Sequence, residues 1–249
     1  MNGAQNHFSF IVTCFNLEKY IGECLDSLVN QKYPSGYFEI VCIDDESTDG
    51  SESILESYRK KFQNIVVRRI RNSGLEKACN VGLKIAKNDL VVRVDGDDIL
   101  SRNFLAVMDR AVRENPGIDF YYCRDYIEYY SLKEQHRKRL PLFDAEDIFA
   151  RGDFFATGTV YRKKDLADIG YFSEETKNCG LENYCVILEF LTKEKKGFAV
   201  SGASFCYRRH SANMSGLKRG AIVRFGKSLL KKYGREFKTN EYHPYGLTI

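Results

Sequence analysis

Two short acidic segments carry the residues of this sequence that are best suited to chemistry. Asp95-Gly96-Asp97-Asp98 follows the apolar run at residues 90–94, and Asp44-Asp45 follows the apolar run at residues 38–43. Carboxylate oxygens are the ligands that Mg²⁺ and Mn²⁺ prefer, and these ions commonly share their coordination with substrate phosphates. The first segment therefore predicts a divalent-metal site that would neutralise charge on a diphosphate leaving group. The alternative is an acidic turn in which Asp98 caps the next helix.

The second acidic segment has two possible uses. One of its carboxylates, for which we favour Asp45, can accept hydrogen bonds from a nucleobase or a ribose hydroxyl. The following Ser47, Thr48 and Asp49 are residue types that cap helix starts. The sequence contains neither of the glycine-rich phosphate loops GxxxxGK[ST] and GxGxxG. Carboxylates beside a phosphate ligand then require a divalent cation between them.

The elements around these segments follow a regular order. Short apolar runs alternate with stretches of helical period, which is the pattern of a mostly parallel sheet flanked by helices, an α/β fold. We expect strands at residues 8–14, 38–43, 65–70, 90–94, 119–123, 157–161 and 198–207, helices between the earlier strands and at 183–192, and a charged loop at 131–140. Ligands bind such a sheet at the carboxyl ends of its strands, where both acidic segments fall.

Length and composition agree with one globular domain. The chain has 249 residues, 43% of them hydrophobic, and its net charge of +4 is too small to suggest a nucleic-acid partner. The longest apolar runs are shorter than the roughly 20 residues that span a bilayer, and no leader-like segment opens the chain, so we expect a cytoplasmic protein. The eight cysteines form no CxxC pair, and we interpret them as reduced core residues.

Basic residues are concentrated near the C-terminus. Residues 217–238 hold eight Lys and Arg against one acid, Glu236, and apolar side chains recur among them with helical spacing. Such a basic amphipathic helix either lies at the inner face of an anionic membrane or packs on the domain through the same apolar stripe. We therefore divide the chain into a domain at 1–216 and a basic amphipathic extension at 217–249.

The order of the motifs resembles glycosyltransferase family 2, whose members have the Rossmann-like GT-A fold. The matching segments, in order, are Thr13-Cys14-Phe15-Asn16, Asp44-Asp45-Glu46-Ser47-Thr48-Asp49-Gly50, Asn72-Ser73-Gly74, Asp95-Gly96-Asp97-Asp98 and Tyr207-Arg208-Arg209-His210. The resemblance implies a nucleotide-sugar-binding half at 8–110 and an acceptor-side half at 111–216.

The resemblance also implies a reaction and its residues. We expect metal-dependent, inverting transfer of a sugar, with UDP as the default nucleotide, to a hydroxyl of a glycan or lipid-linked acceptor in cell-surface polysaccharide synthesis. Glu182 would be the catalytic base, and Asp97 and His210 would bind Mn²⁺ or Mg²⁺. The expected nucleotide-sugar-binding residues are Thr13, Phe15, Asn16, Glu18, Asp45, Lys77, Asp95, Gly96 and Arg208.

One departure from the family pattern affects the donor site. Cys79 stands where members commonly have an arginine, so a fixed cation near the nucleotide is missing. Lys77 is the nearby residue that would replace it, although lysine lacks the rigid fork of a guanidinium group.

A second departure affects the base. Asn183 stands where members commonly have an aspartate, and an amide does not accept a proton. We assign the base to Glu182, with Glu174 or Glu175 as the other candidates. The alternative function is a catalytically impaired member that binds a nucleotide or glycan. A sugar nucleotidyltransferase is disfavoured because its glycine-rich opening loop is missing, and a purely structural interaction protein leaves the acidic segments unexplained.

Overall fold

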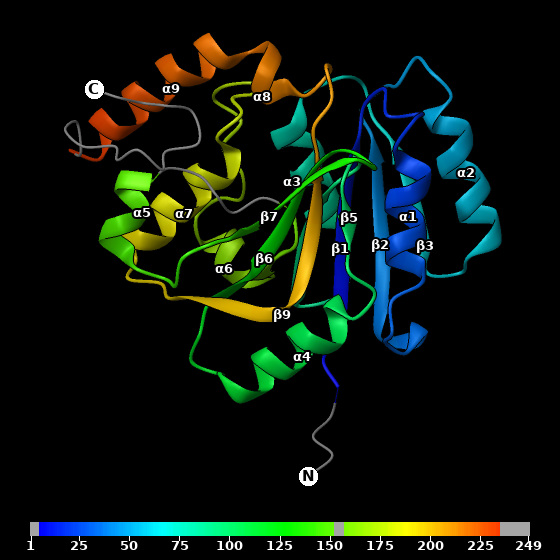
Figure 1. The fold of residues 1–249 in the computed structure, drawn as a ribbon, viewed down its shortest axis with the longest axis horizontal. Helices are drawn as coiled ribbons and strands as arrows, with labels where there is room; N and C mark the ends of the chain where they lie inside the picture. The colour runs from blue at the N-terminus through cyan, green and yellow to red at the C-terminus, as the bar shows by residue number, and fades with distance from the viewer. Residues whose placement is uncertain (1–4, 152–156, 235–249) are drawn as a thin grey trace.

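A nine-stranded sheet with helices on both faces forms the centre of the computed structural model, which describes residues 5–151 and 157–234 (Figure 1). The strands are β1 (Phe8–Cys14), β2 (Phe38–Asp44), β3 (Ile65–Arg69), β4 (Leu90–Asp95), β5 (Ile99–Leu100), β6 (Phe120–Ser131), β7 (Glu134–Arg139), β8 (Thr159–Arg162) and β9 (Gly197–Arg208). The helices are α1 (Ile21–Val29), α2 (Ser51–Lys61), α3 (Leu75–Ile85), α4 (Phe104–Glu114), α5 (Ala145–Arg151), α6 (Lys163–Asp168), α7 (Glu182–Thr192), α8 (Met214–Leu217) and α9 (Arg219–Lys232), with a 3₁₀ turn at Ser35–Tyr37.

The first half of the sheet is parallel, as the sequence predicts. β1 pairs with β2 and β4, and β2 pairs with β3. Every residue of β1 and β2 is buried, which explains why both strands read as continuous apolar runs. Thr13 at the end of β1 lies beside Ile43 and Asp95, so the loops that follow β1, β2 and β4 leave the sheet at one edge.

The second half of the sheet mixes strand directions and returns the chain to the same edge. β8 is antiparallel to β4 and β6, whereas β9 is parallel to β6 and antiparallel to β5. The β5–β9 register sets Ile99 opposite Cys206. The residues after β9 therefore lie next to the acidic segment 95–98, although more than 100 residues separate them in sequence.

The charged segment 131–140 is not a loop, so this expectation was wrong. β6 continues to Ser131, and β7 turns back antiparallel to it, which makes a hairpin. All six residues of β7 are exposed, so the segment lacks the apolar alternation by which a strand is usually detected. Backbone pairing with β6 and a cross-strand ion pair of 2.8 Å between Arg139 and Asp125 hold it in place.

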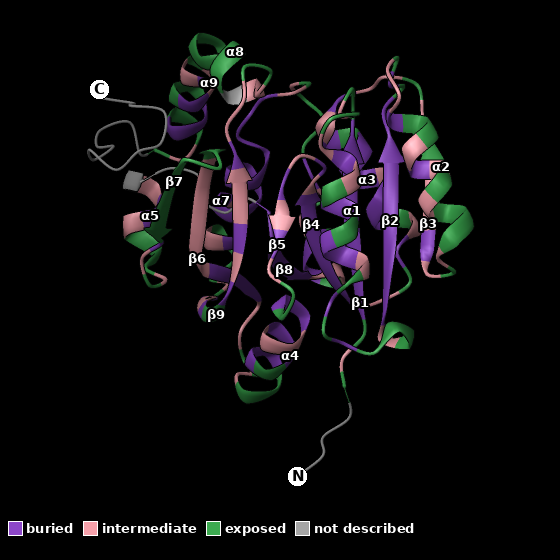
Figure 2. Cartoon of the chain, turned by 45° about the vertical axis from the view of Figure 1, so that its right-hand side comes forward, coloured by how far each residue is buried: buried purple, intermediate pink, exposed green. Residues whose placement is uncertain are grey.

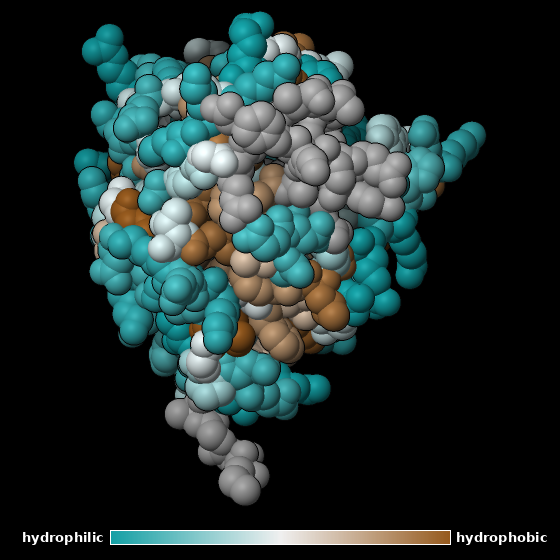
Figure 3. All heavy atoms as spheres, turned by 90° about the vertical axis from the view of Figure 1, so that its left-hand side faces the viewer, coloured by the Kyte–Doolittle hydropathy of each residue, from teal (hydrophilic) through white to brown (hydrophobic). Residues whose placement is uncertain are grey.

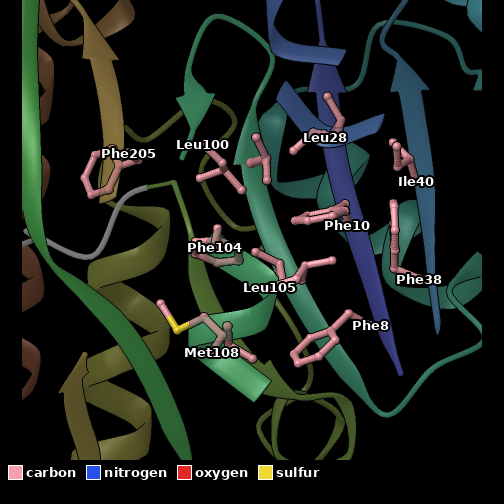
Figure 4. Packing of buried hydrophobic residues seen from close by; sticks show 14 of the residues in the cluster. Phe8, Phe10, Leu28, Phe38, Ile40, Leu100, Phe104, Leu105, Met108 and Phe205 are labelled. Atoms are coloured by element: carbon pink, nitrogen blue, oxygen red, sulfur yellow. The ribbon is translucent and has the colours of Figure 1, made fainter. Parts of the chain in front are cut away.

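Apolar side chains fill two layers, one on each face of the sheet. Helices α1, α2 and α4 cover one face, where α4 packs Phe104, Leu105 and Met108 near Phe8 and Phe10 (Figure 4). Helices α3, α6, α7 and α9 cover the other face. Strands β1, β2 and β4 are buried, whereas β7 and the outer faces of the helices are exposed (Figure 2). All eight cysteines are free and seven are buried, as predicted for reduced core residues.

Helix α9 packs its apolar stripe on the domain, which is the second of the two arrangements considered for the basic extension. Ile222 and Leu230 are each 1% exposed. Gly180 has a positive φ and makes room for this contact, since a Cβ there would lie 2.6 Å from Ile222 Cδ1. Six basic residues of the extension are exposed: Lys218, Arg219, Arg224, Lys227, Lys231 and Lys232. The remainder of the extension, residues 235–249, lies outside the described residues.

Hydrophilic residues surround a smaller hydrophobic patch on the side of the molecule that is at the left in Figure 1 (Figure 3). Within the described ranges, every helix is too short or too polar to cross a bilayer.

Candidate active site

The two expected metal ligands lie in contact. His210 Nε2 lies 3.0 Å from Asp97 Oδ2, although 113 residues separate them in sequence. Asn213 Nδ2 approaches the same carboxylate oxygen at 3.4 Å. The side chains of Asp97 and His210 are 17% and 11% exposed. A carboxylate oxygen and an imidazole nitrogen, both on partly exposed side chains, thus meet at the carboxyl edge of the sheet.

Asp98 connects this edge to the second half of the chain and does not cap a helix, so that alternative was wrong. Its Oδ1 accepts a hydrogen bond of 3.1 Å from the backbone N–H of Arg208, and its Oδ2 accepts one of 2.5 Å from the Thr157 hydroxyl. The same hydroxyl accepts the backbone N–H of Asp95 at 3.0 Å. Burial, with Asp97 and Asp95 adding to it, raises the pKa of Asp98 well above its usual value.

Gly96 is required by the close approach of β1. A Cβ at this position would lie 2.7 Å from the carbonyl oxygen of Thr13, which no side chain could tolerate without a shift of the backbone. Both residues were expected to bind the donor. The structure gives them a role in setting the distance between the β1 and β4 loops.

An aromatic side chain from the start of α1 supports the closing motif. The Tyr20 ring stacks on His210 with a centroid separation of 4.4 Å, and the Arg208 guanidinium lies 5.5 Å from the same ring centroid. Arg208 also pairs with Glu23 at 2.9 Å. Tyr20 thus fixes the orientation of two expected site residues, a role that its place in the sequence did not indicate.

A buried arginine that the sequence analysis overlooked joins two expected site residues. Arg93, 4% exposed, donates from Nη1 and Nη2 to the two oxygens of Asp95 at 3.1 and 2.7 Å. The same Nη2 donates to Glu182 Oε1 at 2.9 Å. The signal was available, because Arg93 is the only charged residue in the apolar run at 90–94 and a buried charge requires partners.

Glu182 begins α7 and is almost fully buried. Its Oε2 has no hydrogen-bond partner among the described residues. Burial raises the pKa of Glu182, and the Arg93 guanidinium opposes this effect. The next residue, Asn183, is 2% exposed, and its side-chain oxygen also lacks a partner within the described chain. Of the other candidates for the base, Glu174 accepts a hydrogen bond of 2.8 Å from Asn80 and Glu175 is exposed.

The two carboxylates of the acidic segment at the end of β2 already have partners within the protein. The two oxygens of Asp45 accept the backbone N–H groups of Ser73 at 2.8 Å and Gly74 at 2.9 Å. Asp44 pairs with Arg69 at 2.7 Å and is fully buried. Asp45 therefore shapes the loop 72–74, and its expected contact with a nucleobase or ribose stays a prediction.

The loop after β1 is held by the loop after β2. Asn16 has a φ of 54° and accepts the backbone N–H of Thr48 at 2.8 Å, while Glu18 accepts the backbone N–H of Gly50 at 3.0 Å. Asp49 accepts the first amide of α2, from Ser51, at 3.0 Å, so it caps that helix as predicted. Ser47 and Thr48 instead contact Asn16. Phe15 remains 48% exposed at the end of β1.

The cation expected at Lys77 does not lie beside Cys79. Lys77 is exposed and lines a polar cavity of about 340 Å³, together with Asn72, Ser73, Glu76, Glu174 and Lys177. Cys79 is fully buried and lies against the guanidinium of Arg93. Arg93 of β4 therefore places a cation beside residue 79, and the expected contact of Lys77 with the nucleotide stays a prediction.

Comparisons of the sequence with known proteins give the family. A sequence model described as glycosyl transferase family 2 matches residues 9–172. The poly(ribitol-phosphate) beta-glucosyltransferase of Bacillus spizizenii is 41% identical over 109 residues, which are 43% of this chain and 17% of that protein. The minor teichoic acid biosynthesis protein GgaA of Bacillus subtilis is 27% identical over 213 residues, which are 81% of this chain and 47% of that protein. The chain thus spans less than half of either relative.

Solved structures show the same fold. The crystal structure of Staphylococcus aureus TarS 1-349 in complex with UDP-GlcNAc matches with a TM-score of 0.70 at 24% identity, over 90% of this chain and 66% of that one. The mannosyltransferase PcManGT of Pyrobaculum calidifontis, in complex with GDP-Man and Mn²⁺, matches with a TM-score of 0.70 at 18% identity, over 95% and 66%. The predicted GT-A fold is confirmed. With the match over residues 9–172, the chain belongs to glycosyl transferase family 2.

Proposed function

We propose that this protein is a metal-dependent, inverting glycosyltransferase that moves a sugar from a UDP-sugar donor to a hydroxyl group of a cell-surface polymer. The observation that carries the proposal is the contact of 3.0 Å between Asp97 and His210, because it brings together, at the carboxyl edge of the sheet, two metal-ligand types that are 113 residues apart in sequence. Family membership and the relatives named above support the same reaction class.

The residues at this edge fit a divalent cation. Asp97 offers a carboxylate oxygen and His210 an imidazole nitrogen, both of which suit Mn²⁺, and Asp97 has no arginine or lysine partner among the described residues. In the proposed function, Asp97 and His210 hold the ion. When bound, it neutralises the charge that develops on the departing diphosphate. The PcManGT complex with GDP-Man and Mn²⁺ supports a metal at this fold.

The chain's own residues perform the remaining steps. Glu182 accepts the proton of the acceptor hydroxyl through Oε2, the oxygen that Arg93 leaves free. The deprotonated oxygen attacks the anomeric carbon, and the nucleoside diphosphate leaves from the opposite face of the sugar. Arg208, held by Tyr20 and Glu23, provides positive charge near the diphosphate. Phe15, half-exposed at the end of β1, provides an aromatic surface for the nucleobase.

The donor and acceptor classes follow from the relatives. One TarS structure contains UDP-GlcNAc, and the relatives from Bacillus are named for poly(ribitol-phosphate) glucosylation and teichoic acid biosynthesis. We therefore propose UDP-glucose or UDP-N-acetylglucosamine as the donor. The acceptor would be a hydroxyl group on a polyol-phosphate polymer or a lipid-linked saccharide.

The experiment that tests this function is a calorimetric titration of UDP into the full chain with and without MnCl₂, followed by turnover assays. Binding of UDP that requires manganese, with weaker binding of GDP and dTDP, is expected. Release of UDP from one of the two proposed donors in the presence of a polyol-phosphate acceptor completes the test. Failure of all three nucleotides to bind under any metal condition would contradict the proposal.

A catalytically impaired member that binds donor without turnover is the second candidate. It is favoured by Asn183, whose amide cannot take a proton, and by the ion pair that Glu182 makes with Arg93. The two candidates differ in one measurement. Manganese-dependent UDP binding without UDP release from any donor and acceptor pair supports the impaired member.

Peripheral association with an anionic membrane is a further part of the proposal. The apolar face of α9 is buried on the domain, so any such contact uses the exposed basic side chains of this helix and not its apolar stripe. A lipid-linked acceptor would place the substrate at the same surface.

A further inference from the structure

We propose that Arg93 is a positioning residue whose single buried guanidinium group sets the orientation of both Asp95, on the donor side, and Glu182, on the acceptor side. The inference rests on the proposed function, because it assigns a role to a residue beside that site. It goes beyond that function by making donor binding and proton removal depend on the same group.

The contacts of Arg93 leave little freedom to either carboxylate. The guanidinium group binds Asp95 through two parallel hydrogen bonds of 3.1 and 2.7 Å, which fix the plane of that carboxylate. Its Nη2 is shared, because it also donates to Glu182 Oε1 at 2.9 Å. The other oxygen of Glu182, Oε2, has no hydrogen-bond partner in the part of the chain that the structure describes.

The position of Arg93 in the fold makes it a rigid support. It lies in the middle of β4, between β1 and β8, and pairs in register with Ile11 and Thr159. Together with apolar residues of the second core layer, including Leu83 and Leu166, it lines a small buried space. A strand in the centre of a sheet holds a functional group more precisely than a loop does.

Among the described residues, Arg93 is the cation that pairs with Asp95 and Glu182, and no second one pairs with either. Arg93 is the only charged residue among those that line the small space beside its side chain, and the others are apolar except for Cys79 and Tyr161. Asp95 and Glu182 both approach one nitrogen, so the loss of Arg93 would leave two carboxylates close together without a cation between them. Each would then turn away from the other, and both the donor contact and the proton acceptor would be displaced.

The test compares Arg93→Met and Arg93→Lys with the wild-type chain. Methionine fills a similar volume without charge, and lysine keeps the charge without the planar fork that binds two groups at once. Arg113→Met is the matched control, because it removes an arginine from an ion pair with Asp109 on α4 that lies away from the site. UDP affinity with manganese, donor KM and kcat are measured for each variant, and circular dichroism reports folding.

A positioning role predicts losses in two quantities at once. Arg93→Met is expected to lower kcat about 100-fold and UDP affinity about tenfold, within the range found when residues that orient a site are removed. Arg93→Lys is expected to recover part of both losses. Arg113→Met is expected to stay within twofold of wild type in both.

Several results would overturn the inference. A folded Arg93→Met with wild-type UDP affinity and kcat, or with a loss in only one of them, would show that Arg93 does not set both carboxylates. If Arg93→Met does not fold, Arg93→Lys provides the test. Wild-type UDP affinity and kcat in Arg93→Lys would then overturn the inference. If the wild-type chain binds UDP without turnover, the proposed catalysis fails. The effect of Arg93 on Asp95 can then still be tested, because Arg93→Met should lower UDP affinity about tenfold.

Discussion

The acidic loops after β2 and β4 resemble each other in sequence but differ in what surrounds their carboxylates. Both oxygens of Asp45 accept backbone N–H groups from the loop 72–74, so hydrogen bonds within the protein already satisfy this carboxylate. Asp97, by contrast, has as its hydrogen-bond partners among the described residues two side chains that lie more than 100 residues later, His210 at 3.0 Å and Asn213 at 3.4 Å. A carboxylate satisfied by backbone amides shapes a loop, whereas one that meets a potential metal ligand has capacity left for a cation.

The largest expected effect is that of Asp97→Ala. If the β4 loop binds the metal, this variant should no longer bind UDP in a manganese-dependent way. Its kcat/KM should fall about 10³-fold, because charge stabilisation of the leaving group is removed. Calorimetry and a UDP-release assay measure both. Asp125→Ala, which breaks a surface ion pair with Arg139, is the control and keeps wild-type values. If Asp97→Ala binds UDP with the manganese dependence of wild type, the β4 loop does not bind the metal and the difference in role between the two loops is contradicted.

Glu182→Gln is expected to have the next largest effect. The amide keeps the shape of the side chain but accepts no proton, so kcat should fall about 10²- to 10⁴-fold while donor KM changes little. Glu175→Gln, at an exposed glutamate, is the matched control. Steady-state kinetics at saturating acceptor separate the two parameters. Full activity of Glu182→Gln together with a loss in Glu174→Gln would move the base to Glu174.

The pH dependence of kcat sharpens the same assignment. Burial raises the pKa of Glu182, and a general base works only in its ionised form. As the pH is lowered, kcat should therefore begin to fall at a pH above about 4.3, the usual glutamate pKa. It should recover as the pH rises through the raised pKa of Glu182. A kcat profile at saturating substrates measures this limb. If the residual activity of Glu182→Gln still falls on acidification in the same way, the titrating group is a residue other than Glu182.

Asp45→Asn tests the structural role of the β2 loop and should have a smaller effect. Its side-chain amide retains one acceptor oxygen for the N–H groups of Ser73 and Gly74, so about 1–3 kcal/mol of unfolding free energy should be lost. Urea denaturation measures the loss, with Asp168→Asn, at an exposed aspartate, as control. If UDP affinity falls sharply while stability is unchanged, Asp45 binds the donor directly and the comparison between the loops must be revised.

The smallest expected effect concerns the exposed bases of α9. Replacing Arg224, Lys227 and Lys231 by glutamate should leave the unfolding free energy nearly unchanged, because surface substitutions are usually within about 0.5 kcal/mol each. Binding to vesicles that contain anionic lipid should be lost, since each base contributes about 1 kcal/mol there. Sedimentation with anionic and with neutral vesicles provides the measurement. These substitutions are preferable to truncation, which would expose the site that Ile222 covers.

The parallel half of the fold and the positions of its loops could be predicted from sequence, because buried parallel strands read as unbroken apolar runs. β7 could not, because its side chains are all exposed and its strand conformation depends on pairing with β6. In the site, the residues at strand ends were found by their acidic character. Thr157 and Tyr20 were missed because each acts through a partner distant in sequence. Arg93 was overlooked although a charged residue inside an apolar run signals a buried ion pair, and only its contact with Glu182 is distant in sequence.

The start of α3 has a consequence for the order in which the chain can fold. The first amide of this helix, from Leu75, is capped by Asn178 Oδ1 at 2.8 Å, a contact that spans 103 residues. During synthesis this amide therefore remains without its native partner until the segment after β8 has been made. A ribosome-bound chain that ends near residue 115 would contain the β1–β4 strands but a frayed α3, so amide exchange at Leu75 would report when the second half has docked.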